Sequence, residues 1–459
     1  MTSNTTTSFK TLAFAGLIFA SYLTSQGVEA RVGASPKIVR QEYGDDAQRQ
    51  LSNDPLAEAG AVYVMTNRVG GIGNSVIVFD RNVTDGTLSR IGLFDTGGLG
   101  GLAGGLTTFP GGFPNDAFGT PNDALASQNS LILSESKRCL FASNAGSDTI
   151  TTFRVTNNGR LLERAGIYPS GGSFPVSITQ RGNTVYALNA GGEASVSGFR
   201  YGDRLCTLSP LDGTTRSMKN DNTNPPFFLL APAQVSFTPD GNGLVATLKG
   251  TNTIHYWSLS TLGFPSDQQV ISPSNGFTPF SFAFDNNGHL LVSEAFGAAP
   301  AAPLPPTPNN GAVSSYNINE DGSLSVISKS VPTGQTATCW IRYFNGRAYT
   351  SNNEPPNPSI SIFSVDDNGV VEIVDQVAAN GEQGIDRAID LSLTADGEFL
   401  YSLSTGSLES DGAGRARISV FKNQGDSLNL VEIVKEGLPL STTTLNFAET
   451  EGVFGLAVL

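Results

Sequence analysis

The apolar positions of the chain recur in short runs, and one run is repeated seven times. Each copy has Ile or Val, two further residues and then an aromatic residue. The seven copies span residues 76–79, 150–153, 196–199, 254–257, 313–316, 360–363 and 418–421. Short runs rich in β-branched and aromatic residues are typical of strands. The pattern therefore predicts seven units that share one strand arrangement.

Other short strands flank each copy. The strand before it closes on a polar residue in every unit: Asn67, Asn144, Asn189, Lys249, Glu294, Asn352 and Ser404. Asp-Gly or Asn-Gly pairs follow several copies, as at Asp85-Gly86 and Asn158-Gly159, and such pairs supply the positive φ angles of tight hairpins. A further apolar strand opens each unit, as at 235–242. The sequence therefore predicts four antiparallel strands per unit.

Units of this kind favour a ring. A lone four-stranded sheet cannot bury both faces, so the units must stack around an axis. The first unit lacks its innermost strand, and residues 451–459 can supply it. We therefore expect an all-β fold over residues 61–459, a seven-bladed β-propeller of four-stranded antiparallel blades that the C-terminal strand closes. The repeated aromatic residues are then expected in the core between blades.

The N-terminal region has the pattern of a secretory signal peptide. Lys10 precedes an apolar run at 12–23, and Val28 and Ala30 are small residues before a cleavage point. We expect residues 1–30 to be the signal peptide, residues 31–60 a flexible leader, and the protein to be secreted and extracellular. An uncleaved membrane anchor is the alternative.

The charge of the chain argues against some partners. It carries 27 Lys and Arg against 41 Asp and Glu, a formal net charge of −14. Nucleic-acid binding needs clustered Lys and Arg, so we expect no nucleic-acid partner, and no membrane partner after signal cleavage. The acidity fits solubility outside the cell, and we expect a monomer.

The sequence allows two covalent modifications, a disulfide and an N-linked glycan. Cys139, Cys206 and Cys339 allow at most one disulfide, the spacing does not say which two would pair, and small buried thiols are the favoured interpretation. The sequon Asn82-Val83-Thr84 makes Asn82 a glycosylation site if the host is eukaryotic.

With these units in hand, the chain resembles the lactonase family of seven-bladed propellers, which includes bacterial 6-phosphogluconolactonases and fungal carboxymuconate lactonising enzymes. The resemblance rests on residues 131–161 (LILSESKRCLFASNAGSDTITTFRVTNNGRL), 235–254 (VSFTPDGNGLVATLKGTNTI) and 332–340 (PTGQTATCW), and it extends over roughly residues 60–459. It implies hydrolysis or formation of a lactone without an obligatory metal. The family also includes many secreted members with no established activity.

The predicted topology places the candidate site residues at one end of the ring, around the channel mouth. We expect substrate-binding residues among the repeated strand ends and the starts of the innermost strands: Asn67, Gln128, Asn144, Asn189, Gln234, Gln335 and Asn352. The repeated Asn also has a structural interpretation, because Asn tolerates left-handed φ and makes Asx-turns, so it ends strands well.

Lys249 and Glu294 break the Asn pattern in neighbouring units. A local ion pair is the structural interpretation of these two charges. The catalytic hypothesis makes Glu294 a general base, with Lys249 or Arg387 stabilising an oxyanion or holding a carboxylate.

Other chemistries have no motif in the sequence. There is no His and Cys cluster with zinc spacing and no phosphate-binding loop, so we expect neither a metal nor a cofactor. His289 falls in a hairpin turn, expected on the opposite face, and His255 falls beside a core aromatic position, so neither is expected in the channel. Two functions stay open: hydrolysis of a small sugar-acid or related lactone, and non-catalytic binding of an extracellular protein or glycan through the loop face.

Overall fold

The structure is a computed structural model that describes residues 60–102, 125–297, 309–354, 357–405, 413–442 and 451–459. The chain divides into two units, Met1–Ser52 and Asn53–Leu459, and every described residue belongs to the second. The predicted signal peptide and all but the last residue of the predicted leader lie outside the described residues.

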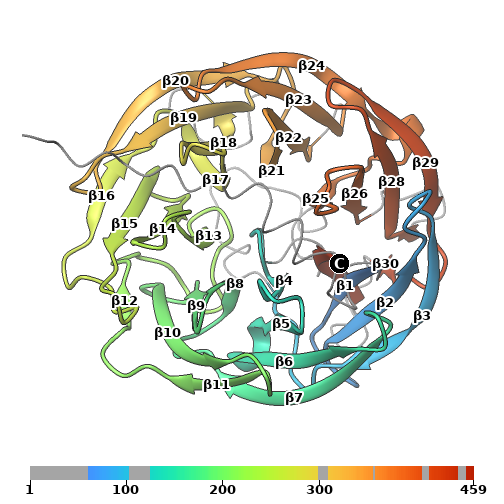
Figure 1. Cartoon of the computed structure of the whole chain (residues 1–459), viewed down its shortest axis with the longest axis horizontal. Coiled ribbons are helices and arrows are strands. Elements are labelled where there is room, and N and C mark those ends of the chain that lie inside the picture. Colours follow the sequence, from blue (N-terminus) through green and yellow to red (C-terminus); the bar gives the residue numbers. More distant parts are fainter. Residues whose placement is uncertain (1–59, 103–124, 298–308, 355–356, 406–412, 443–450) are drawn as a thin grey trace, which may run out of the picture. The chain divides into compact units, whose positions relative to one another are not determined.

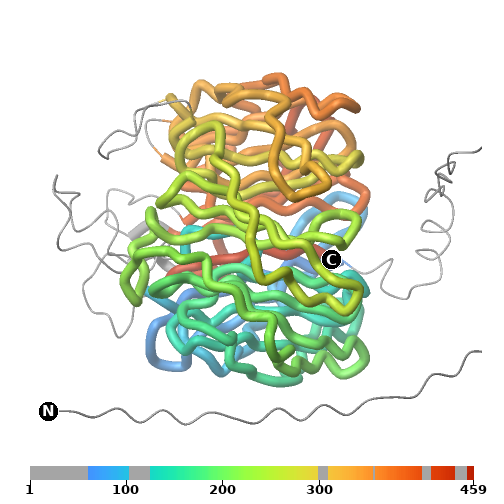
Figure 2. The backbone as a smooth tube through the Cα atoms, turned by 90° about the vertical axis from the view of Figure 1, so that its left-hand side faces the viewer, coloured from blue at the N-terminus to red at the C-terminus, as the bar shows by residue number. Residues whose placement is uncertain are grey.

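The second unit is a ring of seven four-stranded antiparallel sheets (Figure 1). We number these sheets as blades 1 to 7 along the chain. In Figure 2, turned by 90°, the colours pass from blue through green to orange around the ring, so that blades consecutive in sequence lie beside each other. The predicted seven-bladed propeller is therefore confirmed. Among the described residues, no helix is long and apolar enough to cross a membrane.

The strands of each blade follow one another from the axis outward. In this order, blade 1 consists of β31 (Glu451–Val458), β1 (Ala61–Arg68), β2 (Ser75–Arg81) and β3 (Leu88–Asp95), and blade 2 consists of β4 (Leu131–Leu133), β5 (Cys139–Asn144), β6 (Thr149–Thr156) and β7 (Leu161–Pro169). Blade 3 consists of β8 (Pro175–Arg181), β9 (Thr184–Asn189), β10 (Ser195–Gly202) and β11 (Thr207–Pro210), and β12 (Arg216–Ser217) also pairs with β10. Blades 4 and 5 consist of β13 (Pro232–Phe237), β14 (Gly243–Leu248), β15 (Thr253–Ser258) and β16 (Val270–Pro273); and β17 (Phe277–Phe284), β18 (Leu290–Gly297), β19 (Ala312–Ile318) and β20 (Leu324–Pro332). Blades 6 and 7 consist of β21 (Thr338–Phe344), β22 (Arg347–Asn352), β23 (Ser359–Val365) and β24 (Val371–Ala379); and β25 (Ala388–Leu393), β26 (Phe399–Ser404), β28 (Arg417–Asn423) and β29 (Leu428–Val434). A small extra sheet pairs β27 (Ala413–Arg415) with β30 (Leu440–Thr442), and two short 3-10 helices complete the elements, η1 (Ala145–Ser147) and η2 (Gly381–Gln383).

The last strand of the chain closes the ring. β31 pairs antiparallel with β1, with Val62 opposite Val458 and Asn67 opposite Gly452. The innermost strand of the first blade thus comes from the end of the chain, as predicted. This pairing covers the edge of β1, which would otherwise be open for association with other chains.

The repeated aromatic residues lie in the core between blades. All seven are at most 2% exposed: Phe79, Phe153, Phe199, Trp257, Tyr316, Phe363 and Phe421. Burying a side chain of this size contributes about 1.5–3 kcal/mol each, so the periodic pattern marks the packing between sheets. The prediction that these residues form core is confirmed.

Tyrosines of the second strands also join neighbouring blades. The hydroxyl of Tyr63 in blade 1 donates to the carbonyl of Gly159 in the outer hairpin of blade 2, at 2.8 Å. Tyr401 in blade 7 donates in the same way to Gly86 in blade 1, at 2.8 Å. Both acceptor glycines have positive φ, 84° and 80°, which the tight turns require. The Asn-Gly and Asp-Gly turns therefore present a carbonyl to the adjacent blade.

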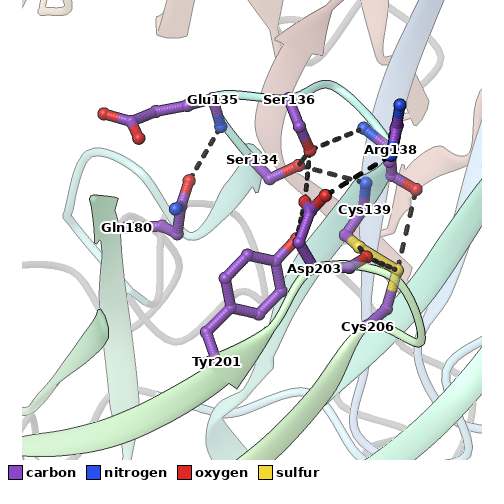
Figure 3. The surroundings of a disulfide bond; sticks show 9 residues. All are labelled: Ser134, Glu135, Ser136, Arg138, Cys139, Gln180, Tyr201, Asp203 and Cys206. Atoms are coloured by element: carbon purple, nitrogen blue, oxygen red, sulfur yellow. Dashed lines mark hydrogen bonds and ion pairs between the residues drawn. A yellow bond between two sulfur atoms is a disulfide. The ribbon is translucent and has the colours of Figure 1, made fainter. Parts of the chain in front are cut away.

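A disulfide links blades 2 and 3 (Figure 3). Cys139 at the start of β5 bonds to Cys206 in the β10–β11 turn, with the Cα atoms 5.7 Å apart. Beside it, Asp203 accepts a hydrogen bond from the hydroxyl of Tyr201 at 2.8 Å. Cys339 is buried and is not part of a disulfide. The interpretation of all three cysteines as thiols is therefore wrong for two of them, because the fold brings residues 67 positions apart together.

Candidate functional site

One end of the ring gathers the connections from second to third strands and those from blade to blade, because successive strands alternate in direction. We call it the mouth face. It includes connections 96–102, 190–194, 249–252, 274–276, 333–337, 353–354 and 380–387. The strand ends predicted to bind substrate lie at this face.

These predicted strand-end residues are buried rather than open to a ligand. The four Asn side chains, Lys249, Glu294 and Ser404 are all at most 2% exposed. Asn144 accepts a hydrogen bond from the Thr96 hydroxyl at 2.8 Å and donates to Thr149 and Thr151 at 3.1 and 3.0 Å. Asn144 therefore ties the end of its strand to the next strand and to the connection that arrives from blade 1.

The other three Asn side chains make the same kind of bridge. Asn352 accepts from Thr338 and donates to two serines of β23, Asn67 exchanges hydrogen bonds with the backbone of Gly101, and Asn189 donates to Ser170 and Ser197. None of the four has a positive φ. The left-handed part of the structural interpretation is therefore wrong, and side-chain hydrogen bonding is the physical reason for Asn at these strand ends.

Glu294 is also enclosed by hydrogen bonds. It is 0% exposed, and its carboxylate accepts from the Gly276 amide at 2.8 Å and from the Ser330 hydroxyl at 2.7 Å. Burial raises the pKa of Glu294, and the surrounding hydroxyl and amide donors oppose that shift. The carboxylate links the entrance of blade 5 to its outermost strand.

Lys249 contacts different groups from Glu294. Its ammonium donates to the Ala126 carbonyl at 2.6 Å and lies 4.9 Å from the centre of the Phe280 ring. The ion pairs of the described residues include none between Lys249 and Glu294. Lys249 holds a segment that crosses the axis.

We call that segment, residues 125–130, the axial segment. It precedes β4 in blade 2 but bonds to blades on the far side of the ring. The backbone amide of Gln128 donates to the backbone carbonyl of Ala233 in blade 4 at 3.1 Å. The Trp340 indole of blade 6 donates to the backbone carbonyl of Ser127 at 2.9 Å. Gln128 and Ser127 are 1% and 6% exposed. The axial segment therefore fills the channel at this level.

Gln128 and Gln234 satisfy the free edges of inner strands. The Gln128 side chain donates to the Ile341 carbonyl and accepts from the Ile341 amide, both at 3.2 Å. Gln234 makes the same pair with Phe282 in the next blade, at 2.9 and 2.8 Å. These amides replace a missing ladder partner, since buried backbone groups must be paired. Gln335 is 7% exposed, and its backbone carbonyl accepts from Gly311.

Arg387 is the predicted catalytic residue that stays accessible. Its guanidinium is 38% exposed and lies 3.9 Å from the Glu354 carboxylate, which is 24% exposed. Burial raises the pKa of Glu354, and the positive charge of Arg387 opposes the shift. Arg387 has a φ of 51°, unusual for a residue with a side chain. The mouth face thus pairs a carboxylate and a guanidinium between blades 6 and 7.

Sequence reasoning missed Glu354. It follows Asn352 in the connection after β22, and the residue pattern contains no motif that joins it to Arg387. The two meet only because blade 7 begins beside the end of the second strand of blade 6. The place of Glu354 two residues after the repeated strand-end Asn352 is the one feature of the sequence that could have drawn attention to it.

The histidines lie away from this pair. His289 contacts Asp285 at 2.6 Å in the β17–β18 hairpin, at the end of the ring opposite the mouth face. His255 in β15 contacts Gln269 at 3.0 Å, and burial lowers its pKa. Within the described ranges, no three His, Cys, Asp or Glu side chains are grouped so as to hold a metal ion.

The comparisons with known proteins agree with the fold. The family model described as lactonase, seven-bladed β-propeller, matches residues 69–212. No curated protein matches the chain.

Solved structures of similar fold span most of the chain. A candidate 6-phosphogluconolactonase from Bacteroides uniformis has a TM-score of 0.58 at 17% identity and covers 83% of this chain and 98% of its own. Its counterpart from Bacteroides fragilis has a TM-score of 0.59 at 16% identity and covers 88% and 99%. The periplasmic gluconolactonase of Pseudomonas aeruginosa has a TM-score of 0.57 at 14% identity and covers 83% and 100%. The predicted seven-bladed propeller fold is therefore confirmed, and the chain resembles the lactonase family over residues 69–212.

Proposed function

We propose that this lactonase-like propeller is a secreted enzyme that hydrolyses a small sugar-acid or related lactone at its mouth face. The observation that carries the proposal is the pair of Glu354 and Arg387, a carboxylate of raised pKa beside a guanidinium, both partly exposed. Perturbed carboxylates next to a specific charge partner are concentrated at functional sites.

The pair fits the two needs of lactone hydrolysis, a base for water and a positive group for the developing oxyanion. In the proposed reaction Glu354 takes a proton from water, whose oxygen bonds to the carbonyl carbon, while Arg387 donates to the carbonyl oxygen. The ring C–O bond then breaks, and protonated Glu354 returns the proton to the leaving alkoxide. The product is the open-chain hydroxy acid.

The two groups are close enough to form an ion pair but are not hydrogen-bonded to each other. At 3.9 Å, nitrogen and oxygen lie beyond hydrogen-bond distance. The carboxylate can then still accept from a water, and the guanidinium can still donate to a carbonyl oxygen. Glu294 has no such freedom, because Gly276 and Ser330 already donate to its two oxygens. For this reason the proposal gives the role of general base to Glu354.

The substrate class and the location draw support from different features. Proteins of similar fold include a periplasmic gluconolactonase and two candidate 6-phosphogluconolactonases, and both of these names refer to lactones of sugar acids. Secretion is supported by the signal-peptide pattern before residue 31 and by the Cys139–Cys206 disulfide. Disulfides form and persist mainly in oxidising compartments.

A second function is favoured by one observation. The axial segment fills the channel with backbone and side chains that bond to blades 3, 4 and 6. A propeller whose channel is filled in this way is suited to binding an extracellular protein or glycan through its loops, without catalysis.

A turnover screen distinguishes the two functions. The wild-type protein and Glu354→Gln are assayed against aldonolactones and muconolactones, with Glu163→Gln as the matched control. Glu163 also pairs with an arginine, Arg154 at 2.6 Å, but on the outer strands of blade 2. We expect Glu354→Gln to lower turnover about 10²–10⁴-fold, since general bases contribute that much, with unchanged melting. Absence of wild-type turnover on every lactone favours the binding function.

A further inference from the structure

The sequon at Asn82 lies in a well-defined exposed turn. This turn joins β2 to β3 at the end of the ring opposite the mouth face. The Asn82 backbone amide donates to the Thr87 carbonyl at 2.9 Å, and the Gly86 amide donates back to the Asn82 carbonyl at 2.9 Å. Asn82 and Thr84 are both exposed.

The two polar atoms of the Asn82 side chain differ in their hydrogen bonding. Its Oδ1 accepts from the Thr84 backbone amide at 2.9 Å. No hydrogen bond from its Nδ2 is found within the described part of the chain. An N-linked sugar would be attached to Nδ2 in place of one of its protons. The fold therefore does not depend on a hydrogen bond from this nitrogen within the described part of the chain.

A hollow lies beside this side chain. It has a volume of about 450 Å³ and lies between blades 1 and 2, where Asp80, Arg81, Asn82, Thr87, Ser89 and Arg160 contribute to its lining. Carboxylate, guanidinium and hydroxyl groups are the partners that sugar hydroxyls bind. The hollow offers a first sugar both space and polar contacts.

We propose that Asn82 carries an N-linked oligosaccharide. In this step the Asn82 Nδ2–sugar C1 bond forms, the bond from C1 to the pyrophosphate of a lipid-linked oligosaccharide donor breaks, and Nδ2 loses a proton. The attachment occurs on a chain entering the secretory pathway of a eukaryotic cell, so the inference rests on the secretion proposed above. The folded ring accommodates the product because Asn82 is exposed and lies at the end of the ring opposite the mouth face.

The location of Asn82 keeps the modification separate from the proposed reaction. Glu354 and Arg387 lie at the mouth face between blades 6 and 7, whereas Asn82 lies at the other end of blade 1. A large polar group at Asn82 is therefore expected to leave lactone turnover unchanged. It covers part of the junction between blades 1 and 2, where Arg160 pairs with Asp80 at 2.7 Å.

The test uses the full chain expressed in yeast or insect cells and analysed by intact mass and peptide mapping, with and without peptide-N-glycosidase. We expect one oligosaccharide, removed by the glycosidase with conversion of Asn82 to Asp. Asn82→Gln and Thr84→Ala should abolish it, and the matched variant Thr84→Ser should retain it, because a serine also completes the sequon.

The same peptide map shows whether the Cys139–Cys206 disulfide has formed. This distinguishes failure of the glycosylation inference from failure of the proposed secretion. Unmodified Asn82 in a protein that carries the disulfide overturns the glycosylation inference and leaves secretion standing. Unmodified Asn82 together with reduced cysteines overturns both. A mass increase that persists in Thr84→Ala places the modification elsewhere and also overturns the inference.

Discussion

Arg342 of blade 6 and Asp390 of blade 7 form an ion pair close to the axis, with Nη2 and Oδ1 3.3 Å apart. The second oxygen of Asp390 accepts from the backbone amide of Leu456 in the closing strand, at 2.9 Å. Arg342 also donates to the Asn129 side chain of the axial segment at 3.0 Å. One carboxylate thus connects blades 6, 7 and 1, and its charge state bears on how well the ring stays closed.

Titration of Asp390 gives a prediction about pH. Burial raises its pKa to about 6, against the opposing effect of Arg342. Because this pKa is higher in the folded protein than in the unfolded chain, where it is near 4, protonation of Asp390 stabilises the fold. The stabilisation is fully present below pH ~4 and is lost as the pH rises through about 6. Above that pH the carboxylate is charged and depends on Arg342. We therefore expect Arg342→Gln to destabilise the protein by about 3 kcal/mol at pH ~8 and by clearly less at pH ~5.

Denaturant unfolding of wild type and Arg342→Gln at both pH values checks this expectation. Arg154→Gln, which removes an exposed pair on outer strands, is the control and should cost no more than about 1 kcal/mol at either pH. An equal loss of stability in Arg342→Gln at the two pH values contradicts the charged state assigned to Asp390.

The side-chain amide of Gln128 is predicted to hold the axial segment in the channel. Gln128→Ala removes the Gln128 donor from the Ile341 carbonyl, whereas the Ile341 amide still donates to the Ser281 hydroxyl at 2.9 Å. A buried polar group that loses its partner costs about 1–3 kcal/mol. We expect a loss of about 1–3 kcal/mol in unfolding free energy, measured in denaturant. The exposed Gln268 is a matched control, and its change to Ala should stay within about 0.5 kcal/mol. A Gln128→Ala protein as stable as the control would show that the axial segment is not held by this amide.

The disulfide between blades 2 and 3 should stabilise the protein measurably. Removal of a native disulfide typically costs about 2–5 kcal/mol. We expect dithiothreitol to lower the melting temperature of wild type and of Cys339→Ala, because Cys339 is not part of the bond. The Cys139→Ala/Cys206→Ala double variant should melt lower and be insensitive to the reductant. Insensitivity of the wild type would count against the bond.

Deletion of residues 451–459 should open the ring. Without β31 the edge of β1 is uncovered, and the interface between blades 7 and 1 loses its inner strand. We expect loss of cooperative unfolding or aggregation, seen by calorimetry and light scattering. Unchanged melting of a monodisperse truncated protein would show that closure does not depend on this strand.

The fold could be predicted because its signals are local and repeated. The aromatic positions such as Phe79 and Phe363 recur at fixed places in each strand group, and packing between blades is what they have in common. The missing first strand of blade 1 was predictable by simple counting of strands. Each of these inferences needs only neighbouring residues and the requirement that a ring have no open edge.

The candidate site is less predictable because it depends on contacts between distant residues. The sequence favours Gln128 as a ligand-binding group at the channel mouth, yet its partner is Ile341, 213 residues away, and the pairing is structural. Lys249 and Glu294 stand out from the Asn repeat, but nothing local indicates that both are buried. The position of Arg387 before an inner strand identifies it, whereas Glu354 becomes visible only when blades 6 and 7 are placed side by side.

The central claim is tested most directly by the pH dependence of kcat/KM for a verified lactone substrate. With Glu354 as general base, the acid limb of the profile reports its pKa, and Arg387 holds that pKa down. We expect Glu354→Gln to lose about 10²–10⁴-fold in kcat/KM and Arg387→Gln to keep a weaker activity whose acid limb lies at higher pH than in wild type, with melting unchanged in both. Full activity of Glu354→Gln, or an acid limb that does not move in Arg387→Gln, would contradict the assignment of this pair as the reaction centre.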